Sequence, residues 1–125
     1  MPPTTILLVD DDDAIRRVMR AMLELTGYRV LDSAVPQAAC DLFDKNPMAI
    51  DLLLTDIKMP GMTGQALAAR LVTARPDLPV IFISGYLDAA SASALEGPER
   101  RVLAKPFEAI QLLEAVTELL SAVKD

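Results

Sequence analysis

Five polar residues follow apolar runs in this 125-residue sequence, and together they could act on a phosphoryl group. They are three aspartates, a serine and a lysine: Asp10, Asp11, Asp56, Ser84 and Lys105. If the apolar runs are parallel strands, their carboxyl ends meet at one edge of a sheet, where open α/β sheets bind ligands. The sequence therefore predicts that three acids, one hydroxyl and one amine share a site.

The three acids require a cation beside them. Two carboxylates about 5 Å apart repel by roughly 3 kcal/mol at an effective dielectric constant near 20, so three together are unstable without compensation. Mg²⁺ is the natural partner, because it commonly binds one or two carboxylates together with water and phosphoryl oxygen. Lys105 would add a positive charge without entering the coordination sphere of the metal.

The same groups could form an acyl phosphate. An aspartate can attack a phosphoryl group when a metal ion and an ammonium group neutralise the charge on the transferring oxygens and hold the donor in line. The hydroxyl of Ser84 could then hydrogen-bond a new phosphoryl oxygen. Such a small movement could serve as a switch.

Short aliphatic runs supply the strands that must position these groups. Continuous runs of this kind are typical of strands buried on both faces of a sheet. The predicted strands cover residues 6–9, 29–34, 50–55, 80–83 and 102–104. The run at 29–34 is less apolar than the others, which favours a place at the sheet edge.

Helical spacing separates the predicted strands. Apolar residues recur at i, i+3, i+4 and i+7 from Ile15 to Leu23, with Asp13 as the expected N-cap and Gly27 as the stop. Further helices are predicted from 36 to 45, from 65 to 75, over 87–97 and over 110–120. The last helix is expected to bury one broad apolar face that comprises Ile110, Leu112, Leu113, Val116, Leu119 and Leu120.

This alternation predicts an α/β fold. Five strands and five helices favour a single doubly wound parallel sheet, covered on both sides through right-handed crossovers. We expect residues 1–125 to form one domain, because no repeat or linker interrupts the pattern and the length suits one core.

The composition excludes several classes of function. The formal net charge is −6, so most of the surface would repel a nucleic acid, and we expect no nucleic-acid binding. The longest uncharged apolar run, 78–83, is far shorter than the ~20 residues of a membrane span, so no membrane association is expected. Without histidine, the chain has no histidine base or phosphocarrier, and its single cysteine agrees with a cytoplasmic location.

Four segments resemble the receiver domain of two-component response regulators. They are Leu8-Val9-Asp10-Asp11, the stretch from Thr55 to Gly64, Ile83-Ser84-Gly85 and Lys105-Pro106-Phe107. Any one segment is a weak signal, but the set in this order at these strand ends is highly specific. The resemblance covers essentially the whole chain, and it implies the flavodoxin-like receiver fold with strand order 2-1-3-4-5.

The resemblance implies a role for each acid. Asp56 would be the phosphoacceptor in a two-component phosphorelay. Asp11 and Asp56 would bind Mg²⁺ together with the backbone carbonyl of Lys58, and Asp10 would help through bound water.

It also implies roles for the other site residues. Ser84 would be the switch hydroxyl, and Lys105 would contact the phosphoryl group, followed by an often cis peptide to Pro106. One position departs from the family: three residues before the lysine, where Tyr or Phe often reports phosphorylation, this chain has Val102. Coupling between the hydroxyl and an aromatic side chain is therefore in question.

The implied partners follow from the phosphorelay. The donor would be a phosphohistidine on a histidine kinase or a histidine phosphotransfer protein, and the output would be a downstream protein or a covalently linked effector. The domain would phosphorylate itself and slowly hydrolyse the acyl phosphate, unlike a multiple-turnover enzyme. Whether it stands alone or belongs to a hybrid kinase or a larger regulator is left open.

Two other functions are consistent with parts of the sequence. Asp10 and Asp12 form the Asp-x-Asp pattern of haloacid-dehalogenase-type phosphohydrolases, which use an aspartate nucleophile. A pseudo-receiver that binds a partner without phosphorylation is the second alternative.

Two further groups of residues have plain structural interpretations. Arg16, Arg17 and Arg20 are expected to form a solvated helix face in preference to a partner-docking patch. Gly61 and Gly64 are expected to serve a turn and a helix start, because their spacing matches no phosphate-binding loop.

Overall fold

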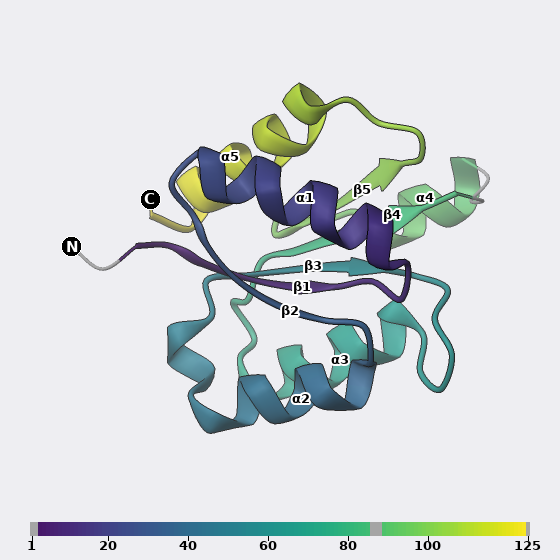
Figure 1. Cartoon of the computed structure of the whole chain (residues 1–125). Helices are drawn as coiled ribbons and strands as arrows, with labels where there is room; N and C mark the ends of the chain where they lie inside the picture. The colour runs from purple at the N-terminus through teal and green to yellow at the C-terminus, as the bar shows by residue number, and fades with distance from the viewer. Residues whose placement is uncertain (1–2, 86–88, 125) are drawn as a thin grey trace.

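The aliphatic runs form the strands of one parallel sheet. In a computed structural model that describes residues 3–85 and 89–124, the strand order is β2-β1-β3-β4-β5 (Figure 1). The strands are β1 (Thr5–Val9), β2 (Arg29–Ser33), β3 (Leu52–Asp56), β4 (Val80–Ser84) and β5 (Arg100–Ala104). The predicted fold class and strand order are confirmed.

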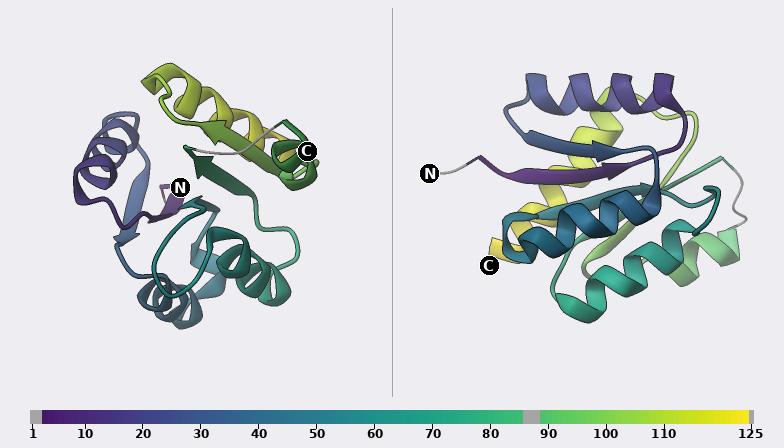
Figure 2. Two further views of the ribbon diagram at one scale, coloured as in Figure 1. Left: turned by 90° about the vertical axis from the view of Figure 1, so that its right-hand side faces the viewer. Right: turned by 60° about the horizontal axis from the view of Figure 1, so that its bottom comes forward.

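Helices cover both faces of the sheet. They are α1 (Asp13–Leu25), α2 (Pro36–Lys45), the 3-10 helix η1 (Pro47–Ala49), α3 (Gly64–Ala74), α4 (Ala89–Leu95) and α5 (Ala109–Lys124). Helices α1 and α5 lie on one face of the sheet and α2 and α3 on the other (Figures 1 and 2). Within the described part of the chain, no helix is long and apolar enough to cross a bilayer.

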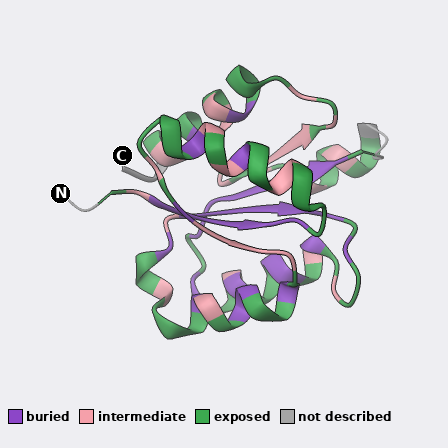
Figure 3. Cartoon of the chain, viewed as in Figure 1, coloured by how far each residue is buried: buried purple, intermediate pink, exposed green. Residues whose placement is uncertain are grey.

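The central strands carry the core. All residues of β1, β3 and β4 are buried (Figure 3). Side chains alternate between the faces, so that Ile6 and Leu8 join the cluster under α1 and α5, while Leu7 and Val9 join the cluster under α2 and α3. The outer strands β2 and β5 are more exposed, and the less apolar composition of β2 predicted its edge position correctly.

The register of the sheet aligns the strand ends that carry the chemistry. Val9 lies opposite Thr55, and Asp56 lies opposite Ile83. The carboxyl ends of β1, β3 and β4 therefore reach the same edge at nearly the same level. Residues far apart in the sequence are placed side by side there.

The N-cap of helix α1 lies one residue earlier than the sequence predicts. The N-cap is Asp12, whose Oδ1 accepts hydrogen bonds from the backbone N–H groups of Ala14 at 3.0 Å and Ile15 at 3.1 Å. Asp13, the predicted cap, is the first helical residue. Either acid in the run could have capped the helix, and Asp12 is the one that has extended backbone angles.

Other predicted boundaries shift at the edges of the sheet. Strand β5 begins at Arg100 and not at Val102. An edge strand tolerates charged side chains, so Arg100 and Arg101 belong to the strand although they interrupt the apolar run used to predict it. Of the helix predicted at 87–97, residues 89–95 are helical, and 87–88 lie outside the described residues. Ile110 is 59% exposed, because it lies about 200° around α5 from the buried Leu112.

A buried arginine links the end of α3 to the start of β3. The Nη1 group of Arg75 donates to the backbone oxygens of Pro47, at 3.1 Å, and of Ile50. Its Nε lies 3.4 Å from Asp77 Oδ1. Ile50, predicted to start the third strand, thus precedes β3 and has its carbonyl bonded to a side chain.

We expect Arg75→Ala to lower the free energy of unfolding by about 2 kcal/mol, because it leaves two partly buried carbonyl oxygens without a donor. Urea denaturation followed by circular dichroism measures this. The matched control is Arg70→Ala on α3, which removes an exposed ion pair with Asp44 and should cost at most about 1 kcal/mol. Equal losses in the two variants would contradict the role assigned to Arg75.

Candidate functional site

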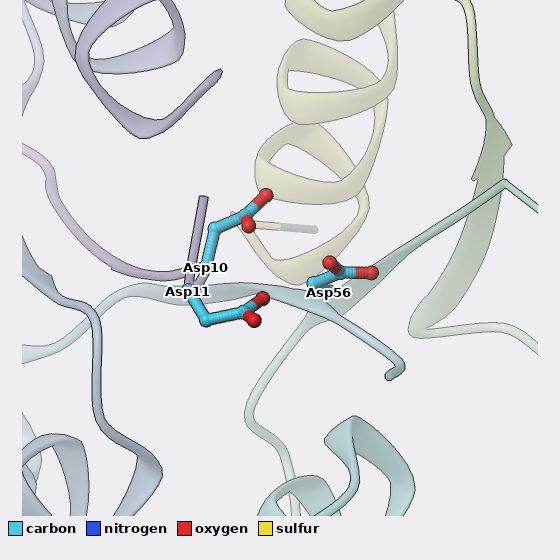
Figure 4. A group of neighbouring side chains, drawn as sticks. All are labelled: Asp10, Asp11 and Asp56. Carbon is cyan, nitrogen blue, oxygen red and sulfur yellow. The ribbon is translucent and has the colours of Figure 1, made fainter. Parts of the chain in front are cut away.

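Three carboxylates meet at the carboxyl ends of β1 and β3. Oxygens of Asp10, Asp11 and Asp56 all lie within 4.8 Å of one another (Figure 4). Asp10 is fully buried, Asp56 is 8% exposed, and Asp11 is exposed. The structure therefore brings together the three acids that the sequence placed at one site.

The turn after β1 is held by hydrogen bonds around Asp10. Its Oδ1 accepts from the N–H of Asp12 at 2.9 Å, its own N–H donates to the carbonyl of Ser33 at 3.2 Å, and its carbonyl accepts from Arg16 Nη1 at 2.8 Å. Burial raises the pKa of the Asp10 carboxyl, although the bond from Asp12 and the charge of Lys105 lower it. Among the described residues, Asp10 Oδ2 has no hydrogen-bond partner.

Lys105 supplies a positive charge to the acids. Its Nζ lies 3.3 Å from Asp56 Oδ2 and 3.9 Å from Asp10 Oδ2. Its backbone N–H donates to the carbonyl of Ser84 at 2.8 Å, and the peptide to Pro106 is cis. The lysine that the sequence analysis selected thus contacts two of the three acids.

The carboxylate of Asp56 is oriented by two different neighbours. Oδ1 accepts from the N–H of Ile57 at 2.8 Å, and Oδ2 faces Lys105. Ser84 ends the neighbouring strand and is 7% exposed. Lys58 lies two residues after Asp56 with an exposed side chain, and its carbonyl as a metal ligand stays a prediction.

The acidic cluster fits a hard divalent cation. Three carboxylates face one nearby ammonium group, and the buried Asp10 Oδ2 is left without a hydrogen-bond donor from the described residues. A buried polar atom of this kind is costly unless water or an ion satisfies it. Oxygen donors in this number are those that Mg²⁺ takes in proteins, usually with water completing its shell.

Comparison with protein families agrees with this geometry. Residues 6–117 match the family model described as the response regulator receiver domain. The chain belongs to this family. The match includes all of the five strands except Thr5, the first residue of β1, and it includes every residue proposed for the site.

Curated relatives include both short and long receiver proteins. The domain is 36% identical to the response regulator receiver protein CpdR of Brucella abortus, over 94% of this chain and 97% of that protein. It is 35% identical to the sensor kinase CckA of the same organism over 93% of this chain, which spans only 12% of CckA. The receiver domain thus spans nearly all of one relative and a small part of another.

Solved structures show the same receiver fold. A response regulator receiver domain protein from Clostridium thermocellum has a TM-score of 0.89 at 27% identity, with 97% of each chain covered. The receiver domain of the hybrid histidine kinase CckA has a TM-score of 0.80 at 34% identity, with 93% of this chain and 98% of that chain covered.

The position of Asp12 bears on the phosphohydrolase hypothesis. Its carboxylate caps α1 and lies outside the cluster formed by the other three acids. An Asp-x-Asp pair acting from β1 would need that carboxylate at the site. The geometry and the family membership together exclude a haloacid-dehalogenase-type assignment.

The structure also corrects the interpretation of the α1 arginines. Arg16 is bonded to the Asp10 carbonyl, and both Arg16 and Arg20 are paired with Asp32 on β2. Only Arg17 of the three belongs to the exposed face that the sequence predicted. The signal that could have revealed this is Asp32, an acidic residue within the run that forms β2.

Gly64 is a second residue whose role the sequence understated. It begins α3, and its N–H donates to the carbonyl of Ile57 at 2.8 Å. A Cβ atom at this position would overlap the carbonyl oxygen of Asp56 and lie 3.0 Å from the Cα of Ile57. Glycine here allows α3 to start directly against the backbone at the end of β3.

We expect Gly64→Ala to destabilise the domain by about 1–3 kcal/mol, because the added methyl group overlaps backbone that cannot move cheaply. Thermal unfolding measures the loss. Gly97→Ala is the matched control, since a Cβ there meets nothing within 4 Å. If both variants unfold at the same temperature, the close contact with Asp56 is not a constraint.

Proposed function

We propose that this receiver domain accepts a phosphoryl group on Asp56 from a phosphohistidine of a histidine kinase or histidine phosphotransfer protein. The main support is the environment of Asp56. Its Oδ1 is held by the N–H of Ile57, its Oδ2 lies 3.3 Å from Lys105 Nζ, and two further acids lie beside it. The acyl phosphate then controls a downstream protein or a linked effector until it is hydrolysed.

The metal ligands in this proposal are Asp11, Asp56 and the backbone carbonyl of Lys58, with Asp10 acting through bound water. Two observations support it: oxygens of the three carboxylates lie within 4.8 Å of one another, and the buried Asp10 Oδ2 accepts no hydrogen bond from the described residues. When bound, Mg²⁺ would neutralise charge on the transferring phosphoryl oxygens. Its ligands also lose their mutual repulsion, so metal binding should stabilise the fold.

The chain's own groups account for the transfer. A carboxylate oxygen of Asp56 forms the bond to phosphorus as the bond from phosphorus to the donor imidazole breaks. The ammonium group of Lys105 then gives up its contact with the carboxylate of Asp56 and pairs with one phosphoryl oxygen. The hydroxyl of Ser84 donates a hydrogen bond to another phosphoryl oxygen. Ser84 ends β4, the strand next to β3, and Lys105 follows the end of β5, so a new charge at Asp56 alters contacts along that side of the sheet.

We also propose that residues 1–125 act as one cytoplasmic domain that binds no nucleic acid itself. The proposed site residues lie at or just after the ends of β1, β3, β4 and β5, so the sheet must be whole for the site to form. The net charge of −6 opposes contact with a nucleic-acid backbone.

An apolar groove beside the acids suits the protein donor. It lies between α1 and the connection from β5 to α5, holds about 480 Å³, and is lined by Ala14, Ile15, Val18, Met19, Met22, Lys105, Pro106 and Phe107. Because Lys105 contacts Asp56 and also lines the groove, the groove opens next to the acceptor. A donor that reaches Asp56 would cover it.

Asp56→Asn should abolish Mg²⁺-dependent labelling by acetyl phosphate, because the amide is a much weaker nucleophile than the carboxylate. Phosphate-affinity electrophoresis or intact-protein mass measures the label. Asp41→Asn, at an exposed acid on α2, is the control and should label like the parent protein. Chelation of Mg²⁺ with EDTA should also remove the label, and labelling of the Asn variant would refute the assignment of Asp56.

Val18→Glu should slow transfer from a protein donor by about tenfold or more while labelling by acetyl phosphate stays unchanged, because a charge in the groove opposes an apolar contact. A panel of autophosphorylated histidine kinases supplies the donor, and the fastest is used for all variants. Leu25→Glu is the control: Leu25 is on the same helix, is 90% exposed and lies outside the groove. Equal slowing by both variants would argue against docking at the groove.

A further inference from the structure

One arginine joins the acidic turn to two other elements. Arg16 donates from Nη1 to the carbonyl of Asp10 at 2.8 Å, from Nε to Asp32 Oδ2 on β2 at 2.9 Å, and from Nη2 to Asp13 Oδ1 at 2.7 Å. Its side chain is only 14% exposed. A guanidinium group used in three directions and largely covered by protein is held in one orientation.

The bond to the carbonyl of Asp10 bears on the neighbouring acid. That carbonyl belongs to the peptide group that joins Asp10 to Asp11. A peptide group is planar, so the direction of its carbonyl determines how the backbone enters the next residue. Fixing the carbonyl toward Arg16 thereby helps to set the direction of the Cα–Cβ bond of Asp11.

Asp11 depends on this backbone control more than the other two acids do. Asp10 is buried in full, and Asp56 is held by the N–H of Ile57 and by Lys105. Asp11 is exposed, yet one of its oxygens lies within 4.8 Å of oxygens of both other acids. An exposed side chain beside two like charges would turn away unless its backbone limits where it can point.

We propose that Arg16 is a positioning residue for the metal site: through the Asp10 carbonyl it holds the Asp10–Asp11 peptide so that the carboxylate of Asp11 faces Asp56. This inference rests on the proposed function, because it concerns the Mg²⁺ ligands named there. Asp32 is the anchor, since it fixes the guanidinium to β2. Arg16 itself touches neither the metal nor the phosphoryl group.

Lysine at position 16 would keep the positive charge but lose the planar set of N–H donors that the guanidinium group provides. The three acceptors come from the end of β1, from β2 and from the first turn of α1. An ammonium group on a flexible stem does not reproduce the planar arrangement of donors that meets them. Arg16→Lys therefore separates the geometry of the guanidinium from its charge.

The test is a calorimetric titration of Mg²⁺ into the parent chain, Arg16→Lys, Arg16→Ala and Arg17→Ala. Loss of a group that orients a metal ligand typically costs 10–100-fold in affinity, so we expect both Arg16 variants to bind Mg²⁺ at least about tenfold more weakly. Arg17→Ala removes the same charge from the exposed neighbour and should bind like the parent. Parental affinity in Arg16→Lys would overturn the inference.

Thermal unfolding with and without Mg²⁺ gives the second readout. A purely structural role would lower the melting temperature of the metal-free protein and leave the Mg²⁺-induced rise intact, which would also overturn the inference. If Arg16→Ala does not fold, Arg16→Lys and Asp32→Asn decide the question, with weaker Mg²⁺ binding expected in both. Failure of the parent chain to bind Mg²⁺ would overturn the proposed metal site, and this inference with it, whereas parental binding with unaffected variants would overturn only the role of Arg16.

Discussion

Repulsion among three carboxylates is the constraint on which this domain is built. Their oxygens lie within 4.8 Å of one another, and Lys105 balances only part of their charge. Separate side chains in water would move apart. Here the parallel register of β1 and β3 and the complete burial of both strands fix the backbone positions from which the three side chains extend. The large aliphatic core thus holds the acids close together, and a bound divalent cation would reduce their mutual repulsion.

Much of this could be predicted from the sequence, because the relevant signals are local. Aliphatic runs that end in polar residues predicted the strands, and parallel topology then required their ends to meet, which is why the three acids and Lys105 were identified together. The run at β2 is less apolar than the others, and this local composition predicted its position at the edge of the sheet. Each of these inferences depends on periodicity within a few residues.

The failures concern contacts that periodicity does not encode. A run of four aspartates offers two equivalent caps, and only the backbone angles select Asp12. Arg16 looks like a solvated residue of α1 until β2 brings Asp32 beside it. Ile110 matches an apolar face in spacing, yet α5 turns it outward.

Val102 departs from the aromatic residue common in the family. It lies opposite Phe82, where it packs partly buried against the core beneath α2 and α3.

Helix α3 is fastened to β3 at both ends. At its start, Gly64 leaves no space between the helix and the backbone of Asp56, and at its end Arg75 grips the carbonyl of Ile50 just before the strand begins. Helix α3 is therefore attached to the backbone on both sides of β3, through Gly64 at one end and Arg75 at the other. If Asp56 is phosphorylated as proposed, α3 and β3 would resist moving apart, and the contacts of Asp56 toward β4, the neighbouring strand that ends at Ser84, would change instead.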